Sequence, residues 1–169
     1  MIELFSGLIP VHYRFIYLTR MGEYPKHDEA RRGQSNGLCG AATPHQLVLI
    51  TGLHTGQVSL MAEWHPTEPS LDSSWEDVVE VSFDVPQRDL VLASFEYHCS
   101  VDVPAVGTHR ARYSADSMDA AKHFDQVSHR DLGPDSYLLQ LWPAPSEPDR
   151  IVRQTSHFAA YWHALAQGS

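Results

Sequence analysis

Histidine and cysteine are the side chains of this sequence with the widest range of chemistry. Eleven histidines and two cysteines are present among 169 residues. A zinc site requires three or four ligands in a tetrahedron, and its usual sign in a sequence is a close pair such as C-x2-C or H-x3-H. Neither pair occurs: His45 and His54 are nine residues apart, and His123 and His129 are six apart. Local spacing therefore predicts no metal and no other cofactor.

His157 and His163 lie six residues apart in a segment with helical periodicity. Six residues correspond to roughly 600° of rotation, so the two imidazoles are predicted on opposite sides of the helix and cannot bind one ion there. A metal site would therefore require a fold that brings distant histidines together across strands.

Cys39 lies in a run of small residues, 37–42, before Thr43 and Pro44. Small side chains permit close approach of the backbone, and a thiol in such a run is a nucleophile, a metal ligand or a small buried hydrophobe. A free cysteine without a base beside it is usually buried. A small metal- or thiol-dependent enzyme that uses Cys39 and clustered histidines is therefore the alternative hypothesis.

Motifs of nucleotide-binding and hydrolytic enzymes are absent. The sequence has no Gly-x4-Gly-Lys-Ser/Thr loop, no G-x-G-x-x-G after a strand and no G-x-S-x-G elbow. Glu63 and Glu80 lie on neighbouring predicted strands, but any acidic antiparallel surface provides such carboxylate pairs. No catalytic residue is predicted, and a non-enzymatic protein is favoured.

A different kind of candidate site is an acidic segment enclosed by two tryptophans. A desolvated aromatic centre with a charged rim suits recognition of a basic protein, because the rings supply affinity and the charges steer the partner. The competing interpretation is that the indoles are core residues, which is favoured for Trp64 and left open for Trp75. The predicted partner-binding residues are Glu68, Asp72, Trp75, Glu76 and Asp77.

The net charge of −9 is concentrated in the middle of the chain. Residues 33–109 contain ten acids and one base, Arg88, and the remaining acids and bases cancel at eleven each. Nucleic-acid binding needs clustered Lys and Arg, so nucleic acid is not a predicted partner. A basic protein such as a nuclease or a toxin suits the charge better. The alternative is that the acids are dispersed, solubilising charges.

The elements that would position these residues are predicted mainly as strands. An apolar run at 47–51, a glycine-bounded loop at 52–56 and alternation through 64 predict a β-hairpin. Strands are also predicted at 11–19, 78–83, 89–97, 98–103, 108–114 and 135–142, with a long loop at 20–36 and a short helix near 117–123.

The end of the chain changes to helical spacing. An apolar stripe that includes Ile151, Phe158 and Trp162 predicts a helix over 149–166, with Ser146 and Asp149 as its starting signal. Strands about ten residues apart favour a sandwich over parallel α/β units. The predicted fold is therefore mainly β, an antiparallel β-sandwich over about 8–143 with a C-terminal α-helix, in a single domain of 1–169.

Length and cysteine content bound the setting of the protein. A chain of 169 residues can bury about 70 % of its unfolded surface, so it needs no disulfide or metal to fold. Two cysteines are too few for a secreted disulfide scaffold, and no segment has the pattern of an export signal or a membrane span. A cytoplasmic protein that is not in the membrane is expected.

Three blocks resemble recurring segments of an uncharacterised family of actinobacterial proteins: LITGLHTGQVSLMAEWHPTEP, SWEDVVEVSF and YLLQLWPAPSEPDRIVRQTS. The opening strand, the acidic central strands and the segment ASFEYHCSVDVPAVGTHRARYSA also resemble, more remotely, the layout of the competence-system inhibitor of the DNA-entry nuclease. That second resemblance implies a small β protein that binds and blocks an enzyme. It assigns no individual residue.

These observations favour a non-enzymatic acidic protein-binding module, an inhibitor or immunity protein whose basic partner is of the nuclease kind.

Overall fold

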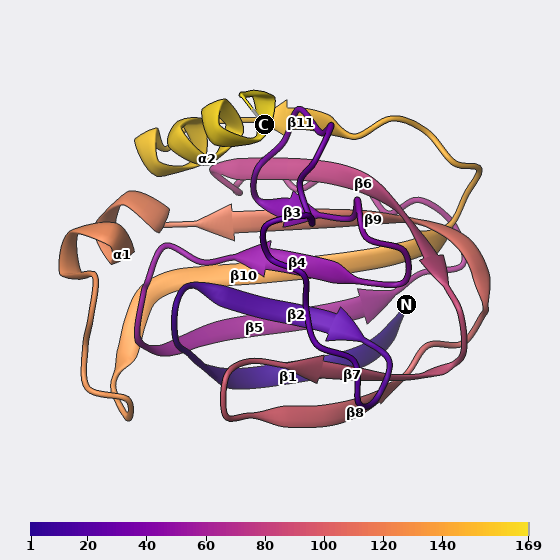
Figure 1. The fold of residues 1–169 in the computed structure, drawn as a ribbon, viewed down its shortest axis with the longest axis horizontal. Coiled ribbons are helices and arrows are strands. Elements are labelled where there is room, and N and C mark those ends of the chain that lie inside the picture. Colours follow the sequence, from indigo (N-terminus) through magenta and orange to yellow (C-terminus); the bar gives the residue numbers. More distant parts are fainter. Residues whose placement is uncertain (169) are drawn as a thin grey trace.

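Two β-sheets packed face to face form the computed structural model, which describes residues 1–168 (Figure 1). Ser169, the last residue of the predicted domain, lies outside the described residues. In spatial order, the large sheet contains β1 (Ile2–Val11), β5 (Gly56–Trp64), β10 (Leu132–Pro143), β9 (Gly107–Asp116), β6 (Asp77–Val85) and β11 (Arg150–Arg153).

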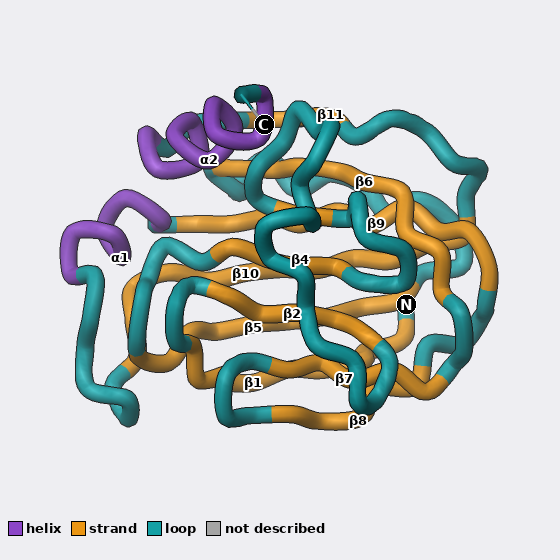
Figure 2. The backbone as a smooth tube through the Cα atoms, in the orientation of Figure 1, coloured by secondary structure: helices purple, strands orange, loops and turns teal. Residues whose placement is uncertain are grey.

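The small sheet contains, in spatial order, β3 (Cys39–Gly40), β4 (Leu47–Ile50), β2 (Phe15–Thr19), β7 (Asp89–Ala93) and β8 (His98–Asp102). Two helices, α1 (Met118–Phe124) and α2 (His157–Gln167), lie toward one side of the sheets (Figure 2). Strand pairs are antiparallel except β5 with β10, which is parallel. The predicted mainly β sandwich with a C-terminal helix is confirmed. Within residues 1–168, no helix is long and apolar enough to cross a membrane.

Alternation along the strands builds the core between the sheets. In β5, Val58 and Leu60 are buried, whereas Ser59 and Met61, which alternate with them, are exposed. Successive side chains of a strand point to opposite faces, so the apolar set of β5 faces the small sheet. Burial of this kind is the main favourable contribution to folding.

The predicted hairpin around 52–56 is wrong, although its two strands exist. β4 pairs with β2 and β3 in the small sheet, while β5 pairs with β1 and β10 in the large sheet. The loop between them therefore crosses from one sheet to the other. Alternation along a strand predicts which of its residues are buried, but it does not identify the strand with which it pairs.

The predicted first strand, 11–19, is also two strands in different sheets. Its alternation is interrupted because Tyr13 and Arg14 have φ values of 60° and 68°. β1 begins at Ile2, well before the predicted start, and β2 begins at Phe15. Similarly, the predicted strand at 89–97 ends at Ala93, where a turn leads into β8.

The C-terminal helix begins eight residues later than predicted. Residues 150–153 form β11 on the edge of β6, and α2 begins at His157. Its N-cap is Ser156 instead of Ser146, since Ser156 Oγ accepts a hydrogen bond from the amide of Ala159 at 3.0 Å. The early start was predicted because Ile151 fits the helical stripe, but the same residue fits an edge strand equally well.

α2 packs closely on the loop before β3. The amide of Gly37 donates a hydrogen bond to Nδ1 of His163 at 2.9 Å. A Cβ atom at Gly37 would lie 2.0 Å from the carbonyl oxygen of Trp162, so only glycine fits here. Burial lowers the pKa of His163, which keeps its imidazole neutral as an acceptor.

Candidate functional site

Polar and charged side chains cross the outer face of the large sheet in one row. Strand register aligns Glu63 of β5, Gln140 of β10, Arg112 of β9, Glu80 of β6 and Arg150 of β11. Each alternates with core-facing neighbours, so the row points away from the small sheet. Glu80 and Arg112 are nevertheless only 1 % and 3 % exposed. Other segments of the chain must therefore cover them.

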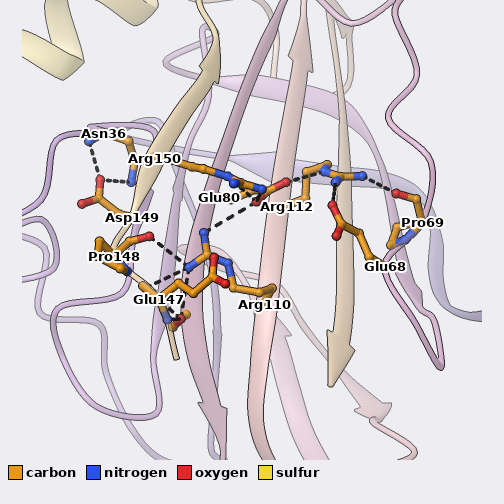
Figure 3. Close-up of polar contacts among 11 residues, drawn as sticks. Asn36, Glu68, Pro69, Glu80, Arg110, Arg112, Glu147, Pro148, Asp149 and Arg150 are labelled. Carbon is orange, nitrogen blue, oxygen red and sulfur yellow. Dashed lines mark hydrogen bonds and ion pairs between the residues drawn. The ribbon is translucent and has the colours of Figure 1, made fainter. Parts of the chain in front are cut away.

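Glu80 is the centre of this arrangement, shown in Figure 3. Its Oε1 accepts a hydrogen bond from Nε of Arg112 at 2.8 Å, and its Oε2 accepts one from Nε of Arg150 at 2.8 Å. Burial raises the pKa of Glu80, but hydrogen bonds and charge from these arginines outweigh burial and hold the pKa below its ordinary value. We call Glu68, Glu80, Arg110, Arg112 and Arg150 the outer-face charge cluster.

Hydrogen bonds from the arginines of the cluster hold two chain segments against the outer face of the sheet. Arg112 donates from Nη2 to the carboxylate of Glu68 at 2.9 Å and from Nη1 to the carbonyl oxygen of Pro69 at 2.8 Å. Arg110 donates from Nη1 to the carbonyl oxygen of Glu147 at 2.9 Å. The cluster thus holds the 65–76 and 143–149 segments in place, which is a structural role.

The five residues predicted to bind a partner lie in different environments. Asp77 is fully buried, and its Oδ1 accepts the two backbone amides just before α2 at 2.7 and 3.1 Å, so its prediction as a surface residue is wrong. Glu76 is half-buried and accepts the amide that precedes α1 at 3.0 Å. Trp75 is half-buried, whereas Glu68 and Asp72 are exposed. The structure therefore leaves Glu68, Asp72 and part of Trp75 accessible.

Glu63 and Glu80 do not lie on neighbouring strands. β10 and β9 separate β5 from β6, and Glu63 pairs instead with His65 at 2.8 Å. Trp64 packs against the core as expected, and its Nε1 donates to Nε2 of His109 at 3.2 Å. Burial lowers the pKa of His109, consistent with a neutral acceptor.

Cys39 is fully buried in the core, and burial raises the pKa of its thiol far above its ordinary value. A buried, protonated thiol is a poor nucleophile, so the thiol-dependent alternative gains no support. His157 is exposed and His163 is buried, in agreement with the predicted opposite sides of the helix. Among residues 1–168, no group of three His, Cys, Asp or Glu side chains is arranged to hold a metal ion.

Aromatic rings gather around the connection between β1 and β2. That connection and the β7–β8 turn lie at the same end of the sheets as α1 (Figure 1). The rings belong to the β1–β2 connection, to β2 itself, to the loop after β2, to the β4–β5 loop and to the β7–β8 turn. Tyr13, Phe95 and Tyr24 expose 55 %, 64 % and 83 % of their surface. We call this surface the aromatic loop end; its members are His12, Tyr13, Phe15, Tyr17, Tyr24, His27, His54 and Phe95.

The backbone at Tyr13 and Arg14 is in the left-handed region, which costs roughly 1–3 kcal/mol for each residue that is not glycine. Contacts of Arg14 hold it there. Its amide donates to the carbonyl oxygen of His54 at 3.3 Å, and its guanidinium donates to the carbonyl of Gly52 and pairs with Asp125. In this strained turn the ring of Tyr13 points outward, so it contributes little to stability through burial.

The rings of the aromatic loop end contact one another. The ring centroid of His12 lies 4.1 Å from that of Tyr13 and 5.2 Å from that of Phe95, and Tyr13 lies 5.3 Å from His54. Burial and the charge of Arg14 lower the pKa of His54. Thr55 Oγ1 lies 2.9 Å from Nδ1 of His12 and 2.8 Å from Nδ1 of His54, which joins the two imidazoles.

Two adjoining hollows flank these rings. The first has a volume of about 360 Å³ and includes His12, Thr55, Phe95 and His129 in its lining. The second has a volume of about 550 Å³ and shares His12 and Phe95 with the first. The surface is thus apolar, exposed and concave, which is the combination found at interaction sites.

The residue pattern does not predict the aromatic loop end. The unbroken alternation over 89–97 predicts Phe95 in a strand, whereas Ser94–Tyr97 is a turn closed by an amide-to-carbonyl hydrogen bond of 2.9 Å. Tyr24 lies in the 20–36 loop, which is predicted only from its polar residues. A large aromatic residue beside Pro25 in this polar segment could have indicated an exposed ring.

Comparison with known proteins identifies similar folds. No protein-family model matches the chain, and no curated protein sequence matches it. A solved structure of ComJ from Bacillus subtilis, an inhibitor of the DNA-degrading activity of NucA, is similar with a TM-score of 0.56 and 15 % identity over 84 % of this chain and 97 % of that chain. A protein described as crocagin biosynthetic gene J is similar with a TM-score of 0.50 and 14 % identity over 83 % and 96 %.

These likenesses concern the fold. They support the remote resemblance to a nuclease inhibitor at that level. The resemblance to an actinobacterial family stays a prediction from the sequence.

Proposed function

We propose that this protein is a non-enzymatic binding module that inhibits a partner protein, such as a nuclease or a toxin, by covering its active surface. The aromatic loop end is the observation that carries the proposal. Tyr13, Tyr24 and Phe95 expose large rings, and Tyr13 does so on a strained backbone. Aromatic residues supply much of the binding energy at protein interfaces. The fold likeness to ComJ supports inhibition as the outcome of binding.

We further propose that the partner is basic. The net charge of −9 attracts cationic proteins over long distances. Glu68, Asp72, Trp75 and Glu76 would contribute to this attraction as a second contact region, whereas the buried Asp77 would not. Rim charges of this kind change the association rate and its salt dependence more than the affinity.

We also propose that the chain forms one domain and acts in the cytoplasm. Cys39 and Cys99 are both free thiols, which suits a reducing compartment.

The test is affinity capture from native lysate with the wild-type chain and with Phe95→Asp, each at low and high salt. Phe95 is exposed, so the variant is expected to fold. We expect a basic protein to be retained by the wild type at low salt and lost from the variant. Stoichiometric addition of the wild type should then abolish the catalytic activity of the purified partner. Capture of the same proteins by both chains, or full activity of the complex, would contradict the proposal.

A further inference from the structure

The second hollow of the aromatic loop end is lined mostly by rings. Tyr13, Phe15, Tyr17, Tyr24 and Phe95 contribute five of them. The remaining lining consists of two imidazoles, a proline and one carboxylate. The imidazole of His27 packs on the ring of Phe15 in a tilted pair with centroids 3.9 Å apart, which forms one wall of the hollow. Aromatic rings carry a quadrupole with a negative face, so a ring-lined hollow of this composition can attract a cation to the faces of its rings.

Asp28 supplies the carboxylate at the edge of this hollow. It is exposed, and the nearby Arg31 lies over the ring of Trp162 at 4.8 Å instead of covering it. Lys26 pairs with Glu29 at 3.9 Å and is not part of the lining. Burial and the charge of Arg31 lower the pKa of His27, so its imidazole is neutral at pH 7. The lining of the hollow therefore includes one carboxylate and no Lys or Arg side chain.

The same chain already places arginines on aromatic rings. Arg14 lies 5.1 Å above the ring of Phe158, and Arg112 lies 5.0 Å above that of Trp142. A guanidinium is planar and weakly hydrated, so it stacks on a ring at a small desolvation cost. An aromatic hollow with a carboxylate at its edge reproduces this environment without an internal arginine.

We propose that the second hollow binds an arginine side chain of the partner, with the guanidinium between the rings of Tyr24 and Phe95 and facing Asp28. This inference rests on the proposed function, because it names the group through which the partner is recognised. An apolar side chain would contact the rings but would form no favourable interaction with the carboxylate of Asp28.

The test is an NMR titration of the full chain with two peptides, acetyl-Gly-Arg-Gly-amide and its citrulline analogue. Citrulline has nearly the shape of arginine without its charge. We expect saturable shifts of the Tyr24 and Phe95 ring signals with the arginine peptide, and about tenfold weaker binding of the citrulline peptide. Equal binding of both peptides, or no shifts with either, would overturn the inference.

Variants at two exposed positions separate ring from charge. Tyr24→Leu should abolish peptide binding, and Tyr24→Phe should retain it, because the face of the ring is the contact. Asp28→Asn should weaken arginine binding about threefold and leave citrulline binding unchanged. Unfolding of these variants is not expected, since Tyr24 is 83 % exposed. Retention of binding by Tyr24→Leu would contradict the inference.

The two proposals fail separately. If Tyr24→Leu still captures and inhibits the partner, the arginine site is wrong while the inhibitory function stands. If the arginine peptide binds as expected and no captured enzyme is inhibited, the inhibitory function is wrong while the site stands.

Discussion

The outer-face charge cluster and the aromatic loop end reverse the usual relation between residue type and location. Glu80 and Arg112 are charged and buried, and their hydrogen-bonding groups are paired within the chain. Tyr24 and Phe95 are apolar and exposed, and most of their surface faces water. In this cluster buried charge holds the chain's own segments together, whereas in the proposed site unburied aromatic surface would contact another molecule.

The largest effect is expected from Glu80→Gln. Removing one partner of a buried ion pair leaves the other charges uncompensated, which costs about 3–5 kcal/mol in the free energy of unfolding. Urea denaturation would measure the loss. Glu3→Gln is the matched control, because Glu3 lies opposite Glu63 in the same row and is exposed. An equal free energy of unfolding for the two variants would show that the cluster does not stabilise the fold.

The same carboxylate predicts a pH dependence. The folded-state pKa of Glu80 is below its ordinary value of 4.5, so its contribution is fully present above that value and is lost as pH falls through the folded pKa. The difference in the free energy of unfolding between wild type and Glu80→Gln should therefore shrink below about pH 4.5. Denaturation series from pH 7 to pH 3 would measure it. A constant difference would contradict this assignment.

A substitution in the aromatic loop end should weaken partner binding and leave the free energy of unfolding nearly unchanged, in contrast to Glu80→Gln. Tyr13→Gly is expected to change the free energy of unfolding by less than about 1 kcal/mol, because relief of the left-handed strain offsets the lost ring contacts. Partner binding should weaken by about tenfold or more, since a central aromatic anchor is removed. Calorimetric titration would measure binding. Val106→Ser is the control, because Val106 is 60 % exposed at the other end of β8. If Tyr13→Gly lost much stability and still bound the partner, Tyr13 would have a structural role like that of Glu80, and the contrast between the two regions would be wrong.

The smallest effect is expected from Asp72→Lys in the acidic segment. Asp72 is exposed and accepts a hydrogen bond from the amide of Ser74 at 2.8 Å, so its replacement disturbs little structure. The association rate with a basic partner should fall about two- to threefold at low salt and be unchanged at high salt. Stopped-flow or surface-based kinetics would measure it. An unchanged rate at low salt would exclude this segment from steering.

Residue patterns revealed burial in this chain better than they revealed neighbours. The alternation of Val58 and Leu60 identified a strand and its buried face correctly, yet the glycine loop before it joins two sheets instead of two paired strands. The sandwich and the terminal helix were predictable because both follow from local periodicity. The partners of Glu80 were not, because they come from β9 and β11, far away in the sequence.

The candidate site was the least predictable part for the same reason. Tyr13, Tyr24 and Phe95 lie in three separate connections, and only the folded sheets bring those connections together. Asp77 was predicted on the surface because its carboxylate suits solvent equally well. Its burial depends on the amides before α2, which no spacing within 64–77 specifies.

The contact between Gly37 and His163 has a consequence for the order of assembly. It joins two positions separated by 126 residues in the sequence. Contacts of such separation form late, because closing a long loop costs chain entropy before the contact repays it. On the ribosome, the segment before β3 would wait for its docking surface until α2 has been synthesised. Nascent chains that end before residue 157 should therefore leave this segment open to proteolysis, and docking of this segment should wait for α2.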